Sequence, residues 1–325
     1  SIVGGVMGAG IAAAGFSAVN WMTMSKIAAS WVISPVLGGF IAALFLWLIK
    51  SRIIYQPDKI AAARKWVPIL IAIMAGAFAS YLALKGLKKV IKIDIQTAII
   101  IGTLIGIVTW AITKPIIIKQ SVGMENRNKS LKQLFNIPLI VSAALLSFAH
   151  GANDVANAVG PLAAIVQASF SGEYVTSISI PLWVMVIGAA GISFGLFLFG
   201  PKLIRVVGNQ ITKLNQMRAY CVALSAAITV IVASWLGLPV SSTHIAVGAV
   251  FGVGFFREWD TARRMKFAKL SNDKNKLVVA KEERARRKLV RRSQFMSIIA
   301  AWIITVPSAA FISGIIYSAI VFSMG

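Results

Sequence analysis

Apolar runs long enough to cross a bilayer constrain this sequence more than any other feature. A membrane-spanning helix needs about 20 apolar residues, and lipid offers no partner for an unpaired backbone amide, so such runs must be helical. Charged residues make up only 13% of the 325 residues, against about 25% in soluble proteins. We therefore predict an all-α polytopic membrane protein with seven ordinary spans, at 2–19, 27–49, 66–84, 95–113, 181–200, 219–236 and 294–322.

Two further apolar runs, 138–168 and 238–256, are interrupted by polar motifs. Glycine, proline and several hydrogen-bonding side chains break their apolar character. Non-helical backbone at membrane depth is tolerated where it is buried in protein or lines a cavity. We therefore predict that these two runs form broken or re-entrant helical hairpins.

The charge is strongly basic, with 33 Lys and Arg against 10 Asp and Glu, a net +23. Basic residues gather between the apolar runs, above all in 257–292, which holds 14 Lys or Arg and 5 Asp or Glu. The positive-inside rule places such a segment in the cytoplasm. A topology signal near anionic lipid is a better interpretation of this charge than nucleic-acid binding, so no nucleic-acid partner is predicted.

An internal repeat relates the beginning of the chain to its last third. Residues 1–10 match 245–254, and the run WVISP at Trp31 resembles WIITVP at Trp302 with one inserted residue. Repeats in transporters place the substrate site near the bilayer midplane, at the interface between them. We predict three parts: 1–50 as the C-terminal part of a first repeat, 51–137 as a linker with two transmembrane helices, and 138–325 as a second repeat.

The first polar motif lies around Asp154, the one acidic residue within an apolar run. On a helix, His150, Asn153, Asp154 and Asn157 fall at i, i+3, i+4 and i+7 and form one polar stripe. Carboxylate and amide oxygens suit a hard cation such as Na⁺. The alternative is hydrogen bonding between helices by the asparagines, with Asp154 protonated.

The second motif is GLPVSSTH, residues 237–244. Its glycine and proline separate two helices, so Ser241, Ser242 and Thr243 lie at or near a helix N-terminus. The amide groups and dipole of such an end attract an oxyanion. The alternative is that these hydroxyl groups only cap the helix.

Neither motif contains Lys or Arg, so a bound oxyanion lacks the usual cationic clamp. Helix ends and bound cations must then balance its charge, which favours co-transport of the anion with Na⁺ or H⁺. Asp154 could also accept the P–OH hydrogen of protonated phosphate, a hydrogen that sulfate lacks at neutral pH.

HGANDVANAVGPLAA and GLPVSSTH together resemble the motifs of the inorganic phosphate transporter (PiT) family. The resemblance implies two inverted repeats, a cation-coupled phosphate symporter in the cell membrane (plasma or inner), and usually a homodimer, with substrate held between two helical hairpins. It implies phosphate binding by Ser241, Ser242, Thr243, Asn153 and Asp154, and Na⁺ binding by Asn153, Asp154, Asn157, Ser242 and Thr243.

Other positions carry weaker expectations. His150 and His244 could bond phosphate or relay a proton, although a structural hydrogen bond is favoured for both, and Gln167 is a further candidate. The family often has a glutamate just before Leu224, where this chain has Ala223. The resemblance also implies that first copies of both motifs precede Ser1, so about half of the ligands are expected to be absent from this sequence.

Several other functions compete with phosphate symport. The same oxyanion cradle could serve an H⁺-coupled phosphate permease or a sulfate permease. An intramembrane enzyme could use His150 and Asp154 as acid and base, but no nucleophile accompanies them. Interrupted helices in repeated halves suit a transporter better than a channel, and a nucleotide-driven pump would carry a phosphate-binding loop that this sequence lacks. We therefore predict a transporter rather than an enzyme, with no cofactor beyond the coupling ion.

Overall fold

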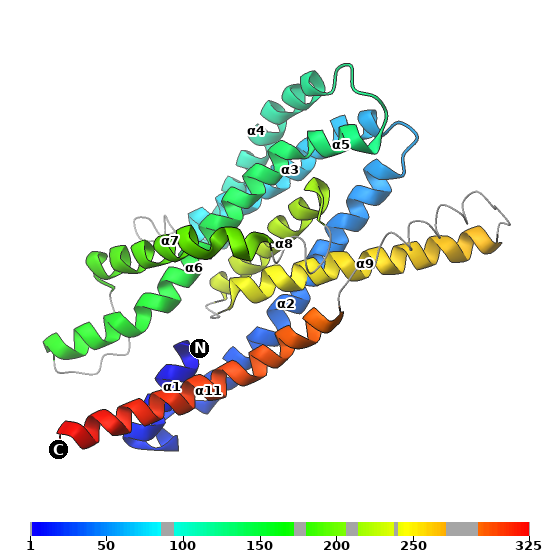
Figure 1. Cartoon of the computed structure of the whole chain (residues 1–325). Coiled ribbons are helices and arrows are strands. Elements are labelled where there is room, and N and C mark those ends of the chain that lie inside the picture. Colours follow the sequence, from blue (N-terminus) through cyan, green and yellow to red (C-terminus); the bar gives the residue numbers. More distant parts are fainter. Residues whose placement is uncertain are drawn as a thin grey trace. The chain divides into compact units, whose positions relative to one another are not determined.

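The computed structural model describes residues 2–85, 94–171, 180–205, 214–236, 240–270 and 292–324. Every regular element within these ranges is helical (Figure 1), which confirms the predicted all-α fold. Two short turns, η1 (Phe16–Ala18, 3₁₀) and η2 (Lys50–Ile54, π), accompany the α-helices. The α-helices are α1 (Ile2–Ala14), α2 (Trp21–Ile49), α3 (Lys59–Lys85), α4 (Ile95–Gln120), α5 (Asn128–Leu134), α6 (Asn136–Ser171), α7 (Leu182–Arg205), α8 (Gln216–Trp235), α9 (Ser242–Leu270) and α11 (Arg292–Met324).

Six of the described helical segments are long and apolar enough to cross a membrane, which confirms a polytopic membrane protein. The predicted span at 2–19 is shorter than expected, because α1 ends at Ala14 and covers 13 residues. Gly15 takes φ +74°, a left-handed conformation that stops an α-helix. The six segments are Trp21–Ile54, Lys59–Ala83, Ile95–Gln120, Leu182–Lys202, Gln216–Ala233 and Ile299–Met324.

The interruption predicted within 138–168 is not seen, because α6 is one helix from Asn136 to Ser171 and includes Pro161. A proline removes only one helical hydrogen bond, and membrane helices tolerate it. The chain bends earlier, by 43° between Asn128–Leu134 and Asn136–Gly151. The second predicted interruption lies between α8, which ends at Trp235, and α9, which begins at Ser242; residues 237–239 lie outside the described ranges.

The chain divides into two compact units. Unit 1 comprises Ser1–Ser30, Gly151–Val206 and Arg291–Gly325, and unit 2 comprises Trp31–His150 and Val207–Val290. Two of the four borders between them fall inside continuous helices, α2 and α6, and the other two lie outside the described residues. This division reports compactness, whereas the three parts predicted from the sequence describe repeats and remain a prediction.

In unit 1, α1 packs on α11 through glycines at four-residue spacing (Figure 1). A Cβ added at Gly4 would lie 2.5 Å from the Val306 carbonyl oxygen, and one at Gly8 would overlap the backbone of Ala310. The two backbones therefore touch directly, the arrangement that small residues permit between membrane helices.

In unit 2, α2 packs on α9 in the same manner. A Cβ at Gly248 would overlap the backbone of Pro35, and one at Gly252 would overlap Gly39. Helices α3 and α4 also meet through small residues, since a Cβ at Gly76 would lie 2.8 Å from the Gly102 carbonyl oxygen. Unit 2 is thus also assembled by backbone-to-backbone contact.

A polar cluster, the clasp, joins the end of α2 to α9 and consists of Lys50, Tyr55 and Asp260. Lys50 Nζ lies 2.6 Å from Asp260 Oδ2, and the Tyr55 hydroxyl donates to the same oxygen at 2.6 Å. The Lys50 and Asp260 side chains are each 13% exposed. Burial opposes ionisation of Asp260, but the bonds from Lys50 and Tyr55 outweigh it and hold its pKa below its usual value.

Candidate functional site

The first polar motif lies on α6, where the helical spacing predicted for its stripe is present. His150, Asp154 and Gln167 are half-buried on this helix. Positions 153 and 157 share the face of Asp154, although the side chains of Asn153 and Asn157 lie outside the described part of the structure. Helix α6 thus places four polar positions on one face, with Gln167 further along the same helix.

Helix α7 packs against the opposite face of α6. Val159 and Ala163 form a buried cluster with Val184 of α7, and Val155 packs beside it. Since successive residues turn by about 100° around a helix, positions 155, 159 and 163 lie diametrically across from the stripe that contains Asp154. The polar stripe therefore points away from α7, because α7 packs against the apolar face of α6.

The second motif forms the start of α9. Ser241 is the N-cap, because its Oγ accepts from the His244 amide at 3.3 Å and its carbonyl accepts from the Ile245 amide at 3.1 Å. Capping, the alternative weighed for the hydroxyl run, therefore accounts for the Ser241 side chain. Ser242 follows with 1% exposure, whereas Thr243 is exposed at the first turn.

An apolar cluster in unit 2 brings the beginning of the first motif to the second. Ala149, the neighbour of His150, is fully buried with Val240 and Ile245, which flank the hydroxyl run. Residues of α8 complete the cluster: Ala226, Val230 and Ala233.

The candidate site residues are thus distributed over both units. His150 and Ser241–His244 belong to unit 2, while Asn153, Asp154, Asn157 and Gln167 belong to unit 1. A shared site built from residues of both remains a prediction. Ala223, which stands where the family often has a glutamate, is buried on α8 with 6% exposure, so this chain offers a methyl group in place of a carboxylate there.

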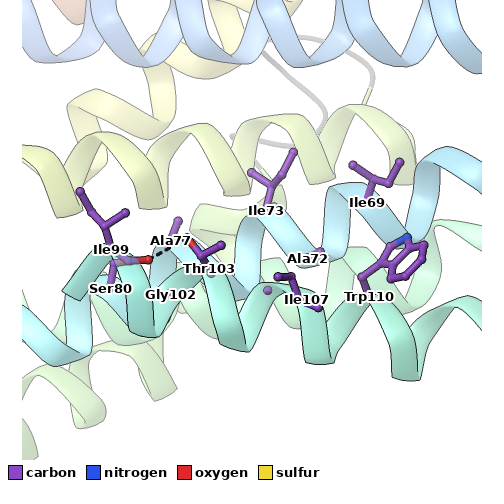
Figure 2. Close-up of a pocket in the computed structure, with 12 residues that line it drawn as sticks. Ile69, Ala72, Ile73, Ala77, Ser80, Ile99, Gly102, Thr103, Ile107 and Trp110 are labelled. Carbon is purple, nitrogen blue, oxygen red and sulfur yellow. Dashed lines mark hydrogen bonds between the residues drawn. The ribbon is translucent and has the colours of Figure 1, made fainter. Parts of the chain in front are cut away.

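A groove of about 570 Å³ lies elsewhere in unit 2, between α3 and α4 (Figure 2). Its lining contains no charged residue, and its polar side chains are Ser80 and Thr103. The Thr103 hydroxyl donates to the Ile99 carbonyl of its own helix at 2.8 Å. This largely apolar groove offers no cationic group to balance the charge of an oxyanion. The other lining residues are Ile69, Ala72, Ile73, Gly76, Ala77, Ile99, Gly102, Gly106, Ile107 and Trp110.

Sequence reasoning missed two features of unit 2. The clasp joins Lys50 to Asp260 across 210 residues, and no local pattern identifies such a partner. Ser34 is buried within α2, but a single serine in an apolar run has no distinguishing spacing. A signal for the clasp existed only in the position of both charges at the ends of apolar runs.

The fold and the motifs define a class: a polytopic α-helical membrane transporter with small-residue helix packing and an oxygen-rich motif on the long helix α6. Comparison with known sequences gives the family. A profile described as "Phosphate transporter family" matches residues 1–313. The chain belongs to the phosphate transporter family, which confirms the resemblance noted in its motifs.

Individual relatives agree with this family. A Helicobacter pylori protein named "Putative phosphate permease" is 44% identical, over 99% of this chain and 70% of its own length. A Pyrococcus furiosus relative of the same description is 31% identical, over 100% of this chain and 71% of its own. A solved structure described as "The sodium-dependent phosphate transporter" is 31% identical with a TM-score of 0.82, covering 98% of this chain and 72% of that one.

Proposed function

We propose that this protein is a Na⁺-coupled symporter that carries inorganic phosphate across the cell membrane by alternating access. Family membership supports phosphate as the substrate, and likeness to a solved sodium-dependent phosphate transporter supports Na⁺ as the coupling ion. The observation that carries the proposal is the half-buried Asp154 on the polar face of α6, opposite the face that α7 covers. A carboxylate at membrane depth is costly and marks an ion or substrate path.

The two motifs take different roles in this proposal. Asn153, Asp154 and Asn157 bind Na⁺ together with Ser242 and Thr243, which reduces the negative charge of the site. Phosphate then docks at the start of α9, against Ser242, Thr243, Asn153 and Asp154. Ser241 caps the helix by accepting from the His244 amide, and its own O–H remains a donor that binds the same phosphate.

The transport cycle follows from charge balance. The chain supplies no Lys or Arg in either motif, so phosphate binds tightly only after the cation has entered. The occupied site allows one repeat to rock against the other, and low internal Na⁺ then promotes release in the cytoplasm. We expect the protein to work as a homodimer in the plasma or inner membrane, with 257–292 on the cytoplasmic side.

The first test is radiolabelled phosphate uptake into proteoliposomes containing the full-length protein, with and without an inward Na⁺ gradient. We expect uptake to require the gradient and to resist competition by excess sulfate. Uptake driven by a pH gradient alone would replace Na⁺ by H⁺ as the coupling ion. Strong competition by sulfate would contradict phosphate selectivity.

A second test concerns Asp154 directly. Asp154→Asn keeps the size of the side chain and removes its charge, so Na⁺-dependent uptake should be lost while the protein still folds. Glu125→Gln is the matched control, because Glu125 is 67% exposed and pairs only with its neighbour Arg127 in the described structure. Wild-type uptake by Asp154→Asn would remove Asp154 from the coupling site.

A further inference from the structure

Ser34 of α2 is buried with 5% exposure, and its hydroxyl has no hydrogen-bond partner in the part of the chain that the structure describes. Other buried serines bond a carbonyl of their own helix: Ser142 donates to Leu139 at 2.9 Å and Ser225 to Val222 at 3.1 Å. A buried hydroxyl without a partner is costly, and a native structure rarely retains one without a reason.

The packing of α2 on α9 shows where Ser34 lies. The two helices advance in the same direction, since Pro35 meets Gly248 and Gly39 meets Gly252. On the face of Ser34 and one turn later, Gly38 lies against Ile245; a Cβ added there would be 3.0 Å from Ile245 Cγ2.

Gly38 and Ile245 are in contact. On each helix, one turn toward the N-terminus leads from Gly38 to Ser34 on α2 and from Ile245 to Ser241 on α9. The Gly38–Ile245 contact places Ser34 beside Ser241 and the Pro35–Gly248 contact places it beside Val247, so Ser34 lies alongside the first two turns of α9. Both segments belong to unit 2, so this placement depends on contacts within a single unit. The unpartnered hydroxyl thus belongs to the part of α2 that packs beside the N-terminal turns of α9.

We propose that the Ser34 hydroxyl donates a hydrogen bond to the phosphate bound at the start of α9, so that Ser34 is a further substrate-binding residue. This inference rests on the proposed function. An oxyanion at a helix N-terminus needs donors, and the two motifs provide no cationic side chain. A buried neutral hydroxyl meets that need, and phosphate gives the hydroxyl the partner that it lacks among the described residues.

The test compares Ser34→Ala with Ser142→Ala, the removal of a second buried serine hydroxyl that already has a partner in its own helix. In phosphate uptake, the KM of Ser34→Ala should be about tenfold higher than that of the wild type. A tenfold change corresponds to the loss of one hydrogen bond to a charged group. The KM of Ser142→Ala should equal that of the wild type.

Thermal unfolding separates binding from structure. Without phosphate, Ser34→Ala should melt at or above the wild-type temperature, because an unpartnered buried hydroxyl is removed. The rise in melting temperature caused by inorganic phosphate should be smaller in Ser34→Ala than in the wild type.

Two results would overturn the inference while wild-type uptake stands. One is an unchanged phosphate KM in Ser34→Ala. The other is a phosphate KM that returns to the wild-type value at saturating Na⁺ while the apparent Na⁺ affinity is tenfold weaker, which would make Ser34 a cation ligand. If the wild type itself takes up no phosphate and shows no phosphate-induced shift in melting temperature, the proposed function fails instead, and the Ser34 inference fails with it.

Discussion

The α1–α11 pair in unit 1 and the α2–α9 pair in unit 2 are built on the same contact. Gly4 and Gly8 of α1 correspond in the sequence match to Gly248 and Gly252 of α9. Each glycine meets the backbone of its partner helix, at Val306 and Ala310 in one pair. The comparison shows that four-residue glycine spacing sets how closely two helices approach, whichever unit contains them.

The partner helices correspond as well, and their register corrects the sequence match. Gly248 contacts Pro35, and the equivalent Gly4 contacts Val306. Pro35 is therefore equivalent to Val306, and Trp31, four residues earlier, is equivalent to Trp302 without the inserted residue that aligning the prolines required. Pro307 therefore lies one position beyond Pro35 in register. Backbone contact is retained between the two pairs, while the position of proline is not.

The pairs differ beyond the glycines. Helix α9 continues to Leu270 and carries Asp260 of the clasp, whereas α1 ends at Ala14 before Gly15. In the sequence match, Phe16 stands where α9 has Asp260. Both pairs thus share close packing, but an ion pair fastens only the α2–α9 pair among the described helices.

Loss of the glycine contact should have the largest effect. Gly8→Ala and Gly252→Ala each place a methyl group on backbone atoms that cannot move aside, so each should destabilise its pair by about 3 kcal/mol, the upper part of the overpacking range. Thermal unfolding in detergent micelles measures this.

Gly5→Ala is the matched control, because nothing lies within 4 Å of a Cβ at Gly5. Similar losses in the two glycine variants would support equal contacts in the two pairs. A Gly8→Ala protein as stable as the Gly5→Ala protein would contradict the close backbone contact of α1 with α11.

Loss of the clasp should come second and affect only unit 2. Asp260→Asn leaves the largely buried Lys50 ammonium without a counter-charge. We therefore expect the free energy of unfolding to fall by about 2 kcal/mol, between the losses measured for exposed and for buried ion pairs. The exposed pair Arg127–Glu125 provides the control, since Glu125→Gln should cost less than about 0.5 kcal/mol. Equal effects of the two substitutions would show that the clasp adds nothing.

The same clasp should make stability depend on pH. The pKa of Asp260 is lowered in the folded protein, so its contribution is complete above about pH 5 and is lost as the pH falls through the lowered pKa. The difference in melting temperature between wild type and Asp260→Asn should be constant from pH 7 to 5 and shrink below pH 4. A difference that stays constant to pH 3 would contradict the ion pair.

The smallest effect should come from Tyr55→Phe, which removes one hydrogen bond to Asp260. Tyr55 is 42% exposed, so water can replace part of the lost hydrogen bond. We therefore expect the free energy of unfolding to fall by at most about 1 kcal/mol. In an Asp260→Asn background the effect should be smaller still, because the two residues share one interaction. Additive losses in the double variant would show that Tyr55 acts independently of Asp260.

The sequence predicted the class of fold better than its details. Apolar length predicted the spanning helices, since lipid forces helix formation irrespective of tertiary contacts. It failed at α6, where Gly151, Gly160 and Pro161 were interpreted as a break although the described helix continues. Glycine and proline weaken a helix locally, but tertiary packing decides whether the helix breaks, and that packing cannot be read from the motif.

The sequence predicted those features of the site that depend on residues close together in the chain. The polar stripe on α6 and the helix start at the hydroxyl run follow from short-range spacing, and both are present. The burial of Ala149 with Val240, the clasp and the position of Ser34 depend on contacts between distant segments. Spacing within a motif carries no information about such contacts.

The separation of α1 and α11 along the chain has a consequence for synthesis of the protein. About 280 residues separate the end of α1 from the start of α11. At roughly 5–20 residues per second, α1 waits between about 14 and 56 seconds for the helix that covers Gly4 and Gly8. During that time its glycine face is open to other small-residue faces in the bilayer. Of the two glycine pairs, the α1–α11 pair therefore leaves its first helix uncovered for longer during synthesis, since fewer residues separate α2 from α9.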